Sequence, residues 1–254
     1  MPTEAEIKAR EKAFHDDRFG QDVDPRGKLD AVYSLTFAST QAYRSLLAMD
    51  FPVNGRFLEY GCGTGGDFNF YKSLRARLYG IDISEEAIQK ARVRAQEQSI
   101  EAEFKVGDAE NTGYDARFFD RIAGLGILHH LDLKKSLLEL SRIAKKDGCC
   151  VFSEPLGHNP IINLFRYLTP KLRTSDEHPL KQHDLELMGR HFADVKVTYF
   201  YLLTFLALPL RRTTLFKPAY RLLTAADERL FKAFPWLGKY AWICVIELRS
   251  PKAA

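Results

Sequence analysis

The chain has 254 residues, 46% of them hydrophobic, and a formal net charge of +4 at pH 7. This length and apolar content allow one large core, so we expect a single α/β domain with additions rather than two separate domains. The basic residues are dispersed and form no dense positive stripe, which disfavours nucleic acid as a partner. Residues 190–254 hold 11 Lys or Arg against 4 Asp or Glu. We favour a solvated face for this basic end over attraction to an anionic substrate or a membrane surface.

Cysteine usage and the N-terminus indicate the compartment. The cysteines show no CxxC spacing and lie in or beside apparent strands, which predicts buried thiols in a reducing compartment. The charged N-terminus lacks the apolar segment of a secretory signal, so we expect a cytoplasmic protein. The four cysteines are Cys62, Cys149, Cys150 and Cys244.

Two helical regions are expected before the first strand. Thr3 to Arg18 is predicted to be a helix, because Thr3 and Glu6 have the spacing of a capping box. A second helical region runs from Pro25 to about Asp50. We assign residues 1–52 to an N-terminal helical cap and 53–254 to the main domain.

A glycine-rich turn follows the first predicted strand, within the stretch Arg56 to Gly66. Glycines permit a sharp turn where any Cβ would block a ligand, which indicates a nucleotide-like cofactor. Gly61, Gly63 and Gly65 read as GxGxG, whereas Gly61, Gly63 and Gly66 read as the GxGxxG of dinucleotide binders. The glycines alone therefore leave two cofactor classes open.

Three acids lie at the ends of successive predicted strands. Glu59 suits the ammonium of an amino-acid moiety and would repel a pyrophosphate, which favours S-adenosylmethionine over NAD. Asp82 ends the strand Arg77 to Asp82 and suits two ribose hydroxyls, a role that both cofactors need. Asp108 follows the strand Ala102 to Val106 and can accept a hydrogen bond from the amine of adenine.

The order of these acids and glycines resembles the class I S-adenosylmethionine-dependent methyltransferases. The segment Phe118 to Leu131 and the later strand Cys149 to Glu154 are similar to motifs of the same family, and the resemblance covers roughly residues 55 to 155. It implies a doubly wound, Rossmann-like α/β fold, with a seven-stranded sheet in the order 3-2-1-4-5-7-6 and the last strand antiparallel. It implies S-adenosyl-L-methionine as cofactor, held by Glu59, Gly61, Cys62, Gly63, Gly65, Asp82, Ile83, Asp108, Ala109 and Leu125.

The family resemblance implies that the N-terminal helices cover the cofactor. His15, Asp16, Tyr33 and Tyr43 are lid candidates, although ordinary packing is favoured for each of them. Helices are expected over Asp67 to Ala76, after Ser84, and over Leu133 to Lys146. A parallel sheet brings the carboxyl ends of its strands to one cleft.

Methyl transfer needs no covalent enzyme intermediate, and a base helps only where the acceptor carries a proton. The candidate catalytic residues lie after the fourth and fifth strands, and a structural role is favoured for any single histidine among them. No HExxH spacing or dense carboxylate cluster is present, so no metal is expected. The candidates are His129, His130, Glu154, His158 and His178.

A long insertion, at about 202–238, separates the last two predicted strands, Val195 to Tyr201 and Tyr240 to Leu248. It begins in the apolar run Phe200 to Leu210, which is too short to span a bilayer. An inserted helical packing layer is favoured, ahead of a lid over an apolar acceptor, and a membrane-surface contact is the least favoured interpretation.

We therefore expect methyl transfer to an O, N or C atom of a small, partly apolar molecule, which we associate with a secondary-metabolite or cell-surface pathway. Three alternatives remain: a cofactor-binding regulatory or scaffolding partner without turnover, an enzyme that rearranges S-adenosylmethionine itself, and an NAD(P)-dependent oxidoreductase. The sequence leaves the acceptor and the oligomeric state open.

Overall fold

A computed structural model describes residues 3–20, 35–169 and 177–252 of the chain. Its centre is a seven-stranded sheet in the order β3-β2-β1-β4-β5-β7-β6, with β7 antiparallel to both of its neighbours. The predicted order and strand direction are confirmed. The strands are β1 (Arg56–Tyr60), β2 (Arg77–Asp82), β3 (Ala102–Val106), β4 (Phe119–Leu125), β5 (Ala144–Pro155), β6 (Phe192–Phe200) and β7 (Ile243–Pro251).

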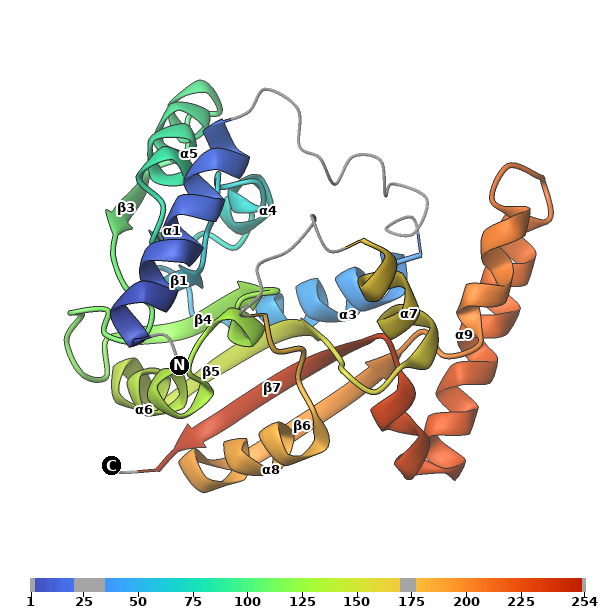
Figure 1. Cartoon of the computed structure of the whole chain (residues 1–254). Helices are drawn as coiled ribbons and strands as arrows, with labels where there is room; N and C mark the ends of the chain where they lie inside the picture. Colours follow the sequence, from blue (N-terminus) through green and yellow to red (C-terminus); the bar gives the residue numbers. More distant parts are fainter. Residues whose placement is uncertain (1–2, 21–34, 170–176, 253–254) are drawn as a thin grey trace.

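Helices cover both faces of this sheet (Figure 1). Strand side chains alternate between two apolar cores, because successive residues of a strand point to opposite faces. Phe57 packs with residues of α3 and α5, whereas the next residue, Leu58, packs with residues of α6 and α8. The α-helices are α1 (Glu4–Gly20), α3 (Phe37–Ala48), α4 (Phe68–Lys72), α5 (Glu85–Glu97), α6 (Leu133–Ile143), α7 (Pro160–Leu168), α8 (Gln182–His191) and α9 (Phe216–Ala233).

Several predicted boundaries were wrong. The helix expected over Asp67 to Ala76 is only the five-residue α4, and the backbone at Arg75 has a positive φ of 53° that ends any helix there. The helix expected to reach Lys146 ends at Ile143, because Ala144 is already extended and pairs with Phe119. Of the second N-terminal helical region, the described part contains α3, while residues 21–34 lie outside the described residues.

The last two strands are also shifted from their expected positions. β6 begins at Phe192, three residues before the predicted start, and ends at Phe200. β7 begins at Ile243 rather than Tyr240, because the 3-10 helix η5 (Pro235–Tyr240) occupies the segment before it. The four cysteines are buried and free.

The insertion between β6 and β7 packs on α3 and the neighbouring sheet. It contains the 3-10 helix η4 (Thr204–Leu210) and α9. Tyr220 of α9 donates its hydroxyl proton to the carbonyl oxygen of Leu35 at 2.9 Å and accepts from the amide of Ala38 at 3.0 Å. Figure 1 places α9 on the side of α3 and α7, away from α1. This arrangement agrees with the packing interpretation.

A buried carboxylate joins the two halves of the insertion. Asp227 of α9 is 2% exposed and accepts hydrogen bonds from the amides of Leu202, Leu203 and Thr204 at 2.7–3.2 Å. It also accepts from the hydroxyl of Thr204 at 2.7 Å. One side chain therefore satisfies the donors at the start of η4, which would otherwise lack partners within that helix.

We expect Asp227→Ala to lower the free energy of unfolding by about 3 kcal/mol, because it leaves several partly buried donors without an acceptor. For a chain of this size that corresponds to a melting-temperature loss of roughly 6–12 °C. Thermal unfolding followed by circular dichroism measures the change. The adjacent exposed acid provides a matched control, since Glu228→Ala should shift the melting temperature little; equal losses in both variants would contradict the anchoring role.

Candidate functional site

The glycine turn after β1 is held against β2. The amides of Gly61 and Cys62 both donate to the carbonyl oxygen of Ile81, each at 2.9 Å. Gly61 has a φ of +75°, and a Cβ there would lie 2.6 Å from the side chain of Ile127. Gly63 has a φ of +49°, and the nearest atom to a Cβ there would be the ring of Phe19 at 3.4 Å. The turn therefore favours glycine at both positions, because both have a positive φ.

Asp82 connects this turn to the helix that follows β2. Its Oδ2 accepts from the amide of Gly63 at 2.8 Å, and its Oδ1 accepts from the amide of Ser84 at 3.0 Å. Ser84 in turn caps α5 by accepting from the amide of Ala87. The Asp82 carboxylate is therefore fixed at the pocket, and each oxygen keeps lone-pair capacity for one more donor.

Glu59 is a buried acid beside the turn, only 4% exposed. Its Oε1 accepts from the hydroxyl of Tyr71 at 3.0 Å, whereas its Oε2 has no hydrogen-bond partner within the described part of the chain. Burial and the nearby Asp67 charge raise the pKa of Glu59 well above its usual value, although the Tyr71 hydrogen bond opposes the shift. A buried acceptor of this kind is suited to a cationic ligand group.

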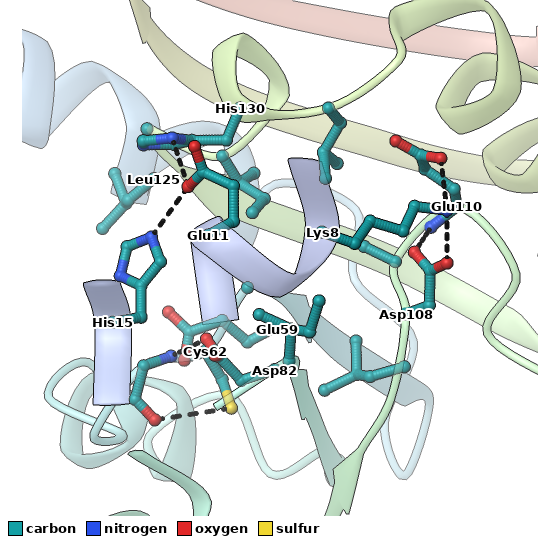
Figure 2. Close-up of a pocket in the computed structure, with 18 of the residues that line it drawn as sticks. Lys8, Glu11, His15, Glu59, Cys62, Asp82, Asp108, Glu110, Leu125 and His130 are labelled. Carbon is teal, nitrogen blue, oxygen red and sulfur yellow. Dashed lines mark hydrogen bonds and ion pairs between the residues drawn. The ribbon is translucent and has the colours of Figure 1, made fainter. Parts of the chain in front are cut away.

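Helix α1 crosses the pocket and is attached to its wall by ion pairs. Lys8 Nζ lies 2.7 Å from Asp108 Oδ2 and 2.8 Å from Glu110 Oε2 (Figure 2). Partial burial opposes the charge of Lys8, but its hydrogen bonds to Asp108, Glu110 and Glu4 raise its pKa. Asp108, which the sequence analysis assigned to the adenine amine, is therefore ion-paired with Lys8 in this structure.

These residues surround a cavity of about 620 Å³, within the size range of small-ligand sites. Of the ten residues predicted to hold the cofactor, all but Gly65 line it. Gly65 lies within the turn, where a Cβ would be 3.2 Å from Ala91. The nine that line the cavity are Glu59, Gly61, Cys62, Gly63, Asp82, Ile83, Asp108, Ala109 and Leu125.

The buried acid at the end of β5 holds the loop after β4. Glu154 is 0% exposed, and its Oε1 accepts from the amides of Ile127 and Leu128, both at 2.9 Å. Its Oε2 lies 2.8 Å from Nδ1 of His129. Glu154 and His129 are therefore positioned to fix the 3-10 helix η2 (Leu128–His130), and neither is among the described residues that line the cavity.

Two of the five candidate catalytic residues do line the cavity, namely His130 and His178. The amide of His178 donates to the carbonyl oxygen of His129 at 2.8 Å, which joins this segment to η2. His158 is partly buried beyond β5 and is not among the described lining residues. The structure therefore brings one pair of histidines to the cavity, and the other three candidates are not among its described lining residues.

The sequence interpretation missed Glu11. This side chain of α1 is 6% exposed and lines the cavity between His15 and His130. Its Oε2 lies 3.2 Å from His130 Nδ1 and 3.5 Å from His15 Nε2. The i,i+4 spacing of Glu11 and His15 places both on one helix face and was the available signal.

The other lid candidates have different positions. Asp16 on α1 accepts from Lys12 and from the hydroxyl of Ser84, so it attaches α1 to the start of α5. Tyr43 is 1% exposed in the apolar core, and Tyr33 lies outside the described residues. The described cavity lining includes no residue of the insertion at 202–238, so the arrangement gives the lid interpretation of that segment no support.

Comparisons with known proteins point to one family. Residues 58–152 match a family model described as a methyltransferase domain. The chain is 27% identical over 134 residues to a ubiquinone biosynthesis O-methyltransferase of Pelagibacter ubique, across 49% of this chain and 55% of that protein. The chain spans about half the length of the curated relatives that it matches.

Solved structures share the fold across most of the chain. One is phosphoethanolamine N-methyltransferase 2 of Haemonchus contortus in complex with S-adenosyl-L-methionine, with a TM-score of 0.64, 15% identity, and coverage of 94% of this chain and 60% of that one. Another is geranyl diphosphate C-methyltransferase of Streptomyces coelicolor A3(2), with a TM-score of 0.63, 14% identity, and coverage of 96% and 98%. At these identities the likeness concerns the fold.

We expect Glu59→Gln to stabilise the unliganded protein at pH 7. The pKa of Glu59 is higher in the folded protein than in the unfolded chain. As the pH rises, the unfolded chain releases this proton at a lower pH than the folded protein does, so the free energy of unfolding falls. The amide keeps an acceptor for Tyr71 and removes the buried charge, so the melting temperature should rise by about 2–4 °C, equivalent to roughly 1 kcal/mol. Melting curves at pH 5 and pH 7 measure this, with the exposed Glu101→Gln as control. A lower melting temperature at pH 7 would refute it.

Proposed function

We propose that this chain, which carries a class I S-adenosylmethionine-dependent methyltransferase domain, transfers a methyl group from S-adenosyl-L-methionine to an O, N or C atom of a small molecule. The observation that carries the proposal is the charge of the cavity. Its described lining has eight Asp or Glu against three Lys or Arg, so it favours a cationic cofactor over the pyrophosphate of NAD(P).

The residues at the cavity fit the proposed cofactor. The buried Oε2 of Glu59 would receive the ammonium of the methionine part, and the Asp82 carboxylate would accept from the ribose hydroxyls. Gly63 leaves the space that the cofactor needs beside the turn. Asp108 and Ala109 would face the adenine, and Lys8 would give up its ion pair with Asp108 when the adenine binds there. The cofactor supplies an electrophilic methyl carbon bound to a sulfonium.

The acceptor would enter on the side of the cavity that His130, His178 and α1 enclose. Holding an acceptor atom there next to the cofactor removes the entropy of bringing two reactants together. The acidic lining disfavours an anionic acceptor, so we propose a neutral or cationic small molecule. The similarity to a ubiquinone biosynthesis O-methyltransferase suits an acceptor with an apolar part.

Helix α1 is the proposed cover of this site, within an N-terminal cap at residues 1–52. Its only buried residue among those described is Glu11, and polar contacts such as Lys8 with Asp108 hold it in place. Ion pairs between partly exposed groups such as Lys8 and Asp108 contribute little stability, so we propose that α1 lifts to admit ligands when the buried contact of Glu11 with His130 separates.

We also propose a cytoplasmic location. The buried free thiols suit a reducing compartment. Within the described residues, every helix is too short or too polar to cross a bilayer.

Turnover tests the proposed activity. The purified chain is incubated with S-adenosylmethionine carrying a labelled methyl group and a small-molecule extract, and we expect S-adenosylhomocysteine together with label in the extract. Binding without consumption would instead indicate a regulatory partner. Consumption without label transfer would indicate rearrangement of the cofactor. Binding of NADH but not of S-adenosylhomocysteine would revive an oxidoreductase.

Asp82→Ala should weaken binding of S-adenosylhomocysteine by roughly 1.5–3 kcal/mol, which is the usual contribution of hydrogen bonds to a charged group. Isothermal titration calorimetry measures the affinity, and circular dichroism checks that the glycine turn still folds without its contact to Gly63. Glu86→Ala, an exposed acid in the first turn of α5, is the matched control and should bind normally. Unchanged affinity in a folded Asp82→Ala protein would remove Asp82 from the site.

A further inference from the structure

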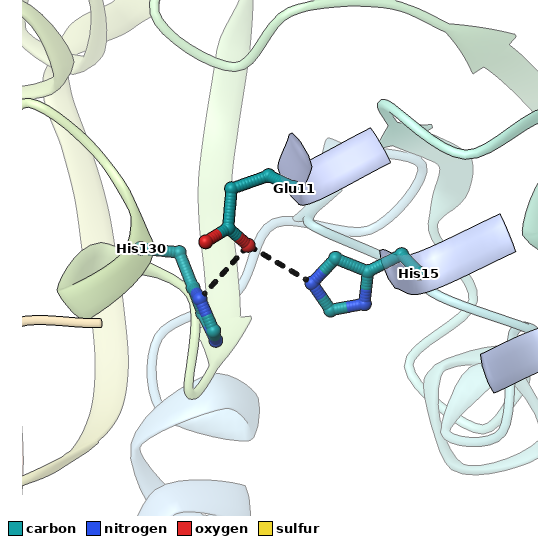
Figure 3. A group of neighbouring side chains, drawn as sticks. All are labelled: Glu11, His15 and His130. Atoms are coloured by element: carbon teal, nitrogen blue, oxygen red, sulfur yellow. Dashed lines mark ion pairs between the residues drawn. The ribbon is translucent and has the colours of Figure 1, made fainter. Parts of the chain in front are cut away.

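We propose that Glu11, His15 and His130 bind one divalent transition-metal ion in the wall of the cavity. Each offers a ligand atom, and the three atoms all lie within 4.8 Å of one another. Figure 3 shows the carboxylate of Glu11 between the two imidazole rings, with α1 supplying two ligands and η2 the third.

The spacing of these atoms matches a coordination sphere. Ligands at 2.0–2.1 Å from a tetrahedral ion lie about 3.3–3.4 Å from each other. Glu11 Oε2 is 3.2 Å from His130 Nδ1 and 3.5 Å from His15 Nε2. His130 Nδ1 is buried, and its 3.2 Å separation from Glu11 Oε2 fits two ligands that share an ion.

A further carboxylate lies near the second ring nitrogen of His130. Glu177 Oε1 is 3.8 Å from His130 Nε2, the ring nitrogen that does not face Glu11. Ligating histidines commonly have a carboxylate on that side of the ring.

A second grouping, His129 with His130 and Glu177, is also compact. We favour the first grouping because His129 is committed to Glu154 through Nδ1 and, unlike Glu11 and His15, is not among the described cavity-lining residues. The excess of carboxylates over basic groups in the cavity attracts cations.

The ligand types select the class of metal. Two imidazoles and one carboxylate suit Zn²⁺, Fe²⁺ or Co²⁺, whereas Mg²⁺ and Ca²⁺ prefer oxygen ligands alone. Three protein ligands leave at least one coordination position open, as in catalytic rather than structural sites. If the proposed methyl transfer is correct, an acceptor oxygen or nitrogen would occupy that position. The sequence predicted no metal because the ligands lie on segments more than 100 residues apart.

Metal binding can be tested without the reaction. The purified full chain is treated with a chelator, dialysed, and titrated with Zn²⁺ by calorimetry and with Co²⁺ by visible absorption. We expect one ion per chain and the intense absorption of a low-coordinate Co²⁺ site. Glu11→Gln and His130→Ala should each weaken Zn²⁺ binding at least about tenfold. His183→Ala, an exposed histidine on α8, should bind Zn²⁺ as the unmodified chain does.

The outcomes separate this proposal from the methyltransferase proposal. Absence of bound Zn²⁺ and Co²⁺, or equal affinity in the unmodified, Glu11→Gln and His130→Ala proteins, overturns the metal site. Circular dichroism establishes that the variants are folded, and Glu11→Gln keeps the side-chain shape should His130→Ala fail to fold. Full methyl transfer by the chelator-treated chain would leave the proposed function intact. Zn²⁺ binding by a chain without turnover would leave the metal site intact.

Discussion

The candidate site depends on one pair of hydrogen bonds, those from the amides of Gly61 and Cys62 to the carbonyl oxygen of Ile81. They hold the turn after β1 against the end of β2, so the next residue on β2, Asp82, meets the amide of Gly63. The positive φ at Gly61 and the contact with Ile127 explain why this turn requires glycine. The loops after β1, β2 and β4 are thereby fixed relative to one another.

The two buried carboxylates beside the site, Glu59 and Glu154, have different roles. Glu154 has several partners, since it accepts two amides and pairs with His129, and it therefore stabilises the loop that carries His130. Glu59 keeps one oxygen without a hydrogen bond in the described structure and has a raised pKa, which is a stability cost in the unliganded protein. A buried carboxylate that lacks a hydrogen bond in the unliganded protein is suited to binding a ligand, whereas one whose two oxygens are both bonded is suited to positioning other residues.

The two additions to the sheet are attached by different forces. Helix α1 lies over the cavity through ion pairs and buries only Glu11 among its described residues. The insertion packs through apolar and aromatic contacts to α3 and is joined internally by the buried Asp227. Apolar burial and a buried carboxylate hold the insertion, whereas polar contacts hold α1, from the partly exposed pair of Lys8 with Asp108 to the buried pair of Glu11 with His130.

The glycines and strand-end acids of the sequence by themselves pointed to residues that line the cavity, because these local signals are gathered at one edge by a parallel sheet, and the sheet order followed from the family resemblance that they carry. Element ends were less certain: Ala144 extends early because it pairs with Phe119, a distant residue. Only the tertiary structure decided that His130 faces the cavity while His129 is held behind it by Glu154. It alone brought Glu11 to His130, because contacts between residues far apart in the chain depend on how α1 packs, which no local pattern records.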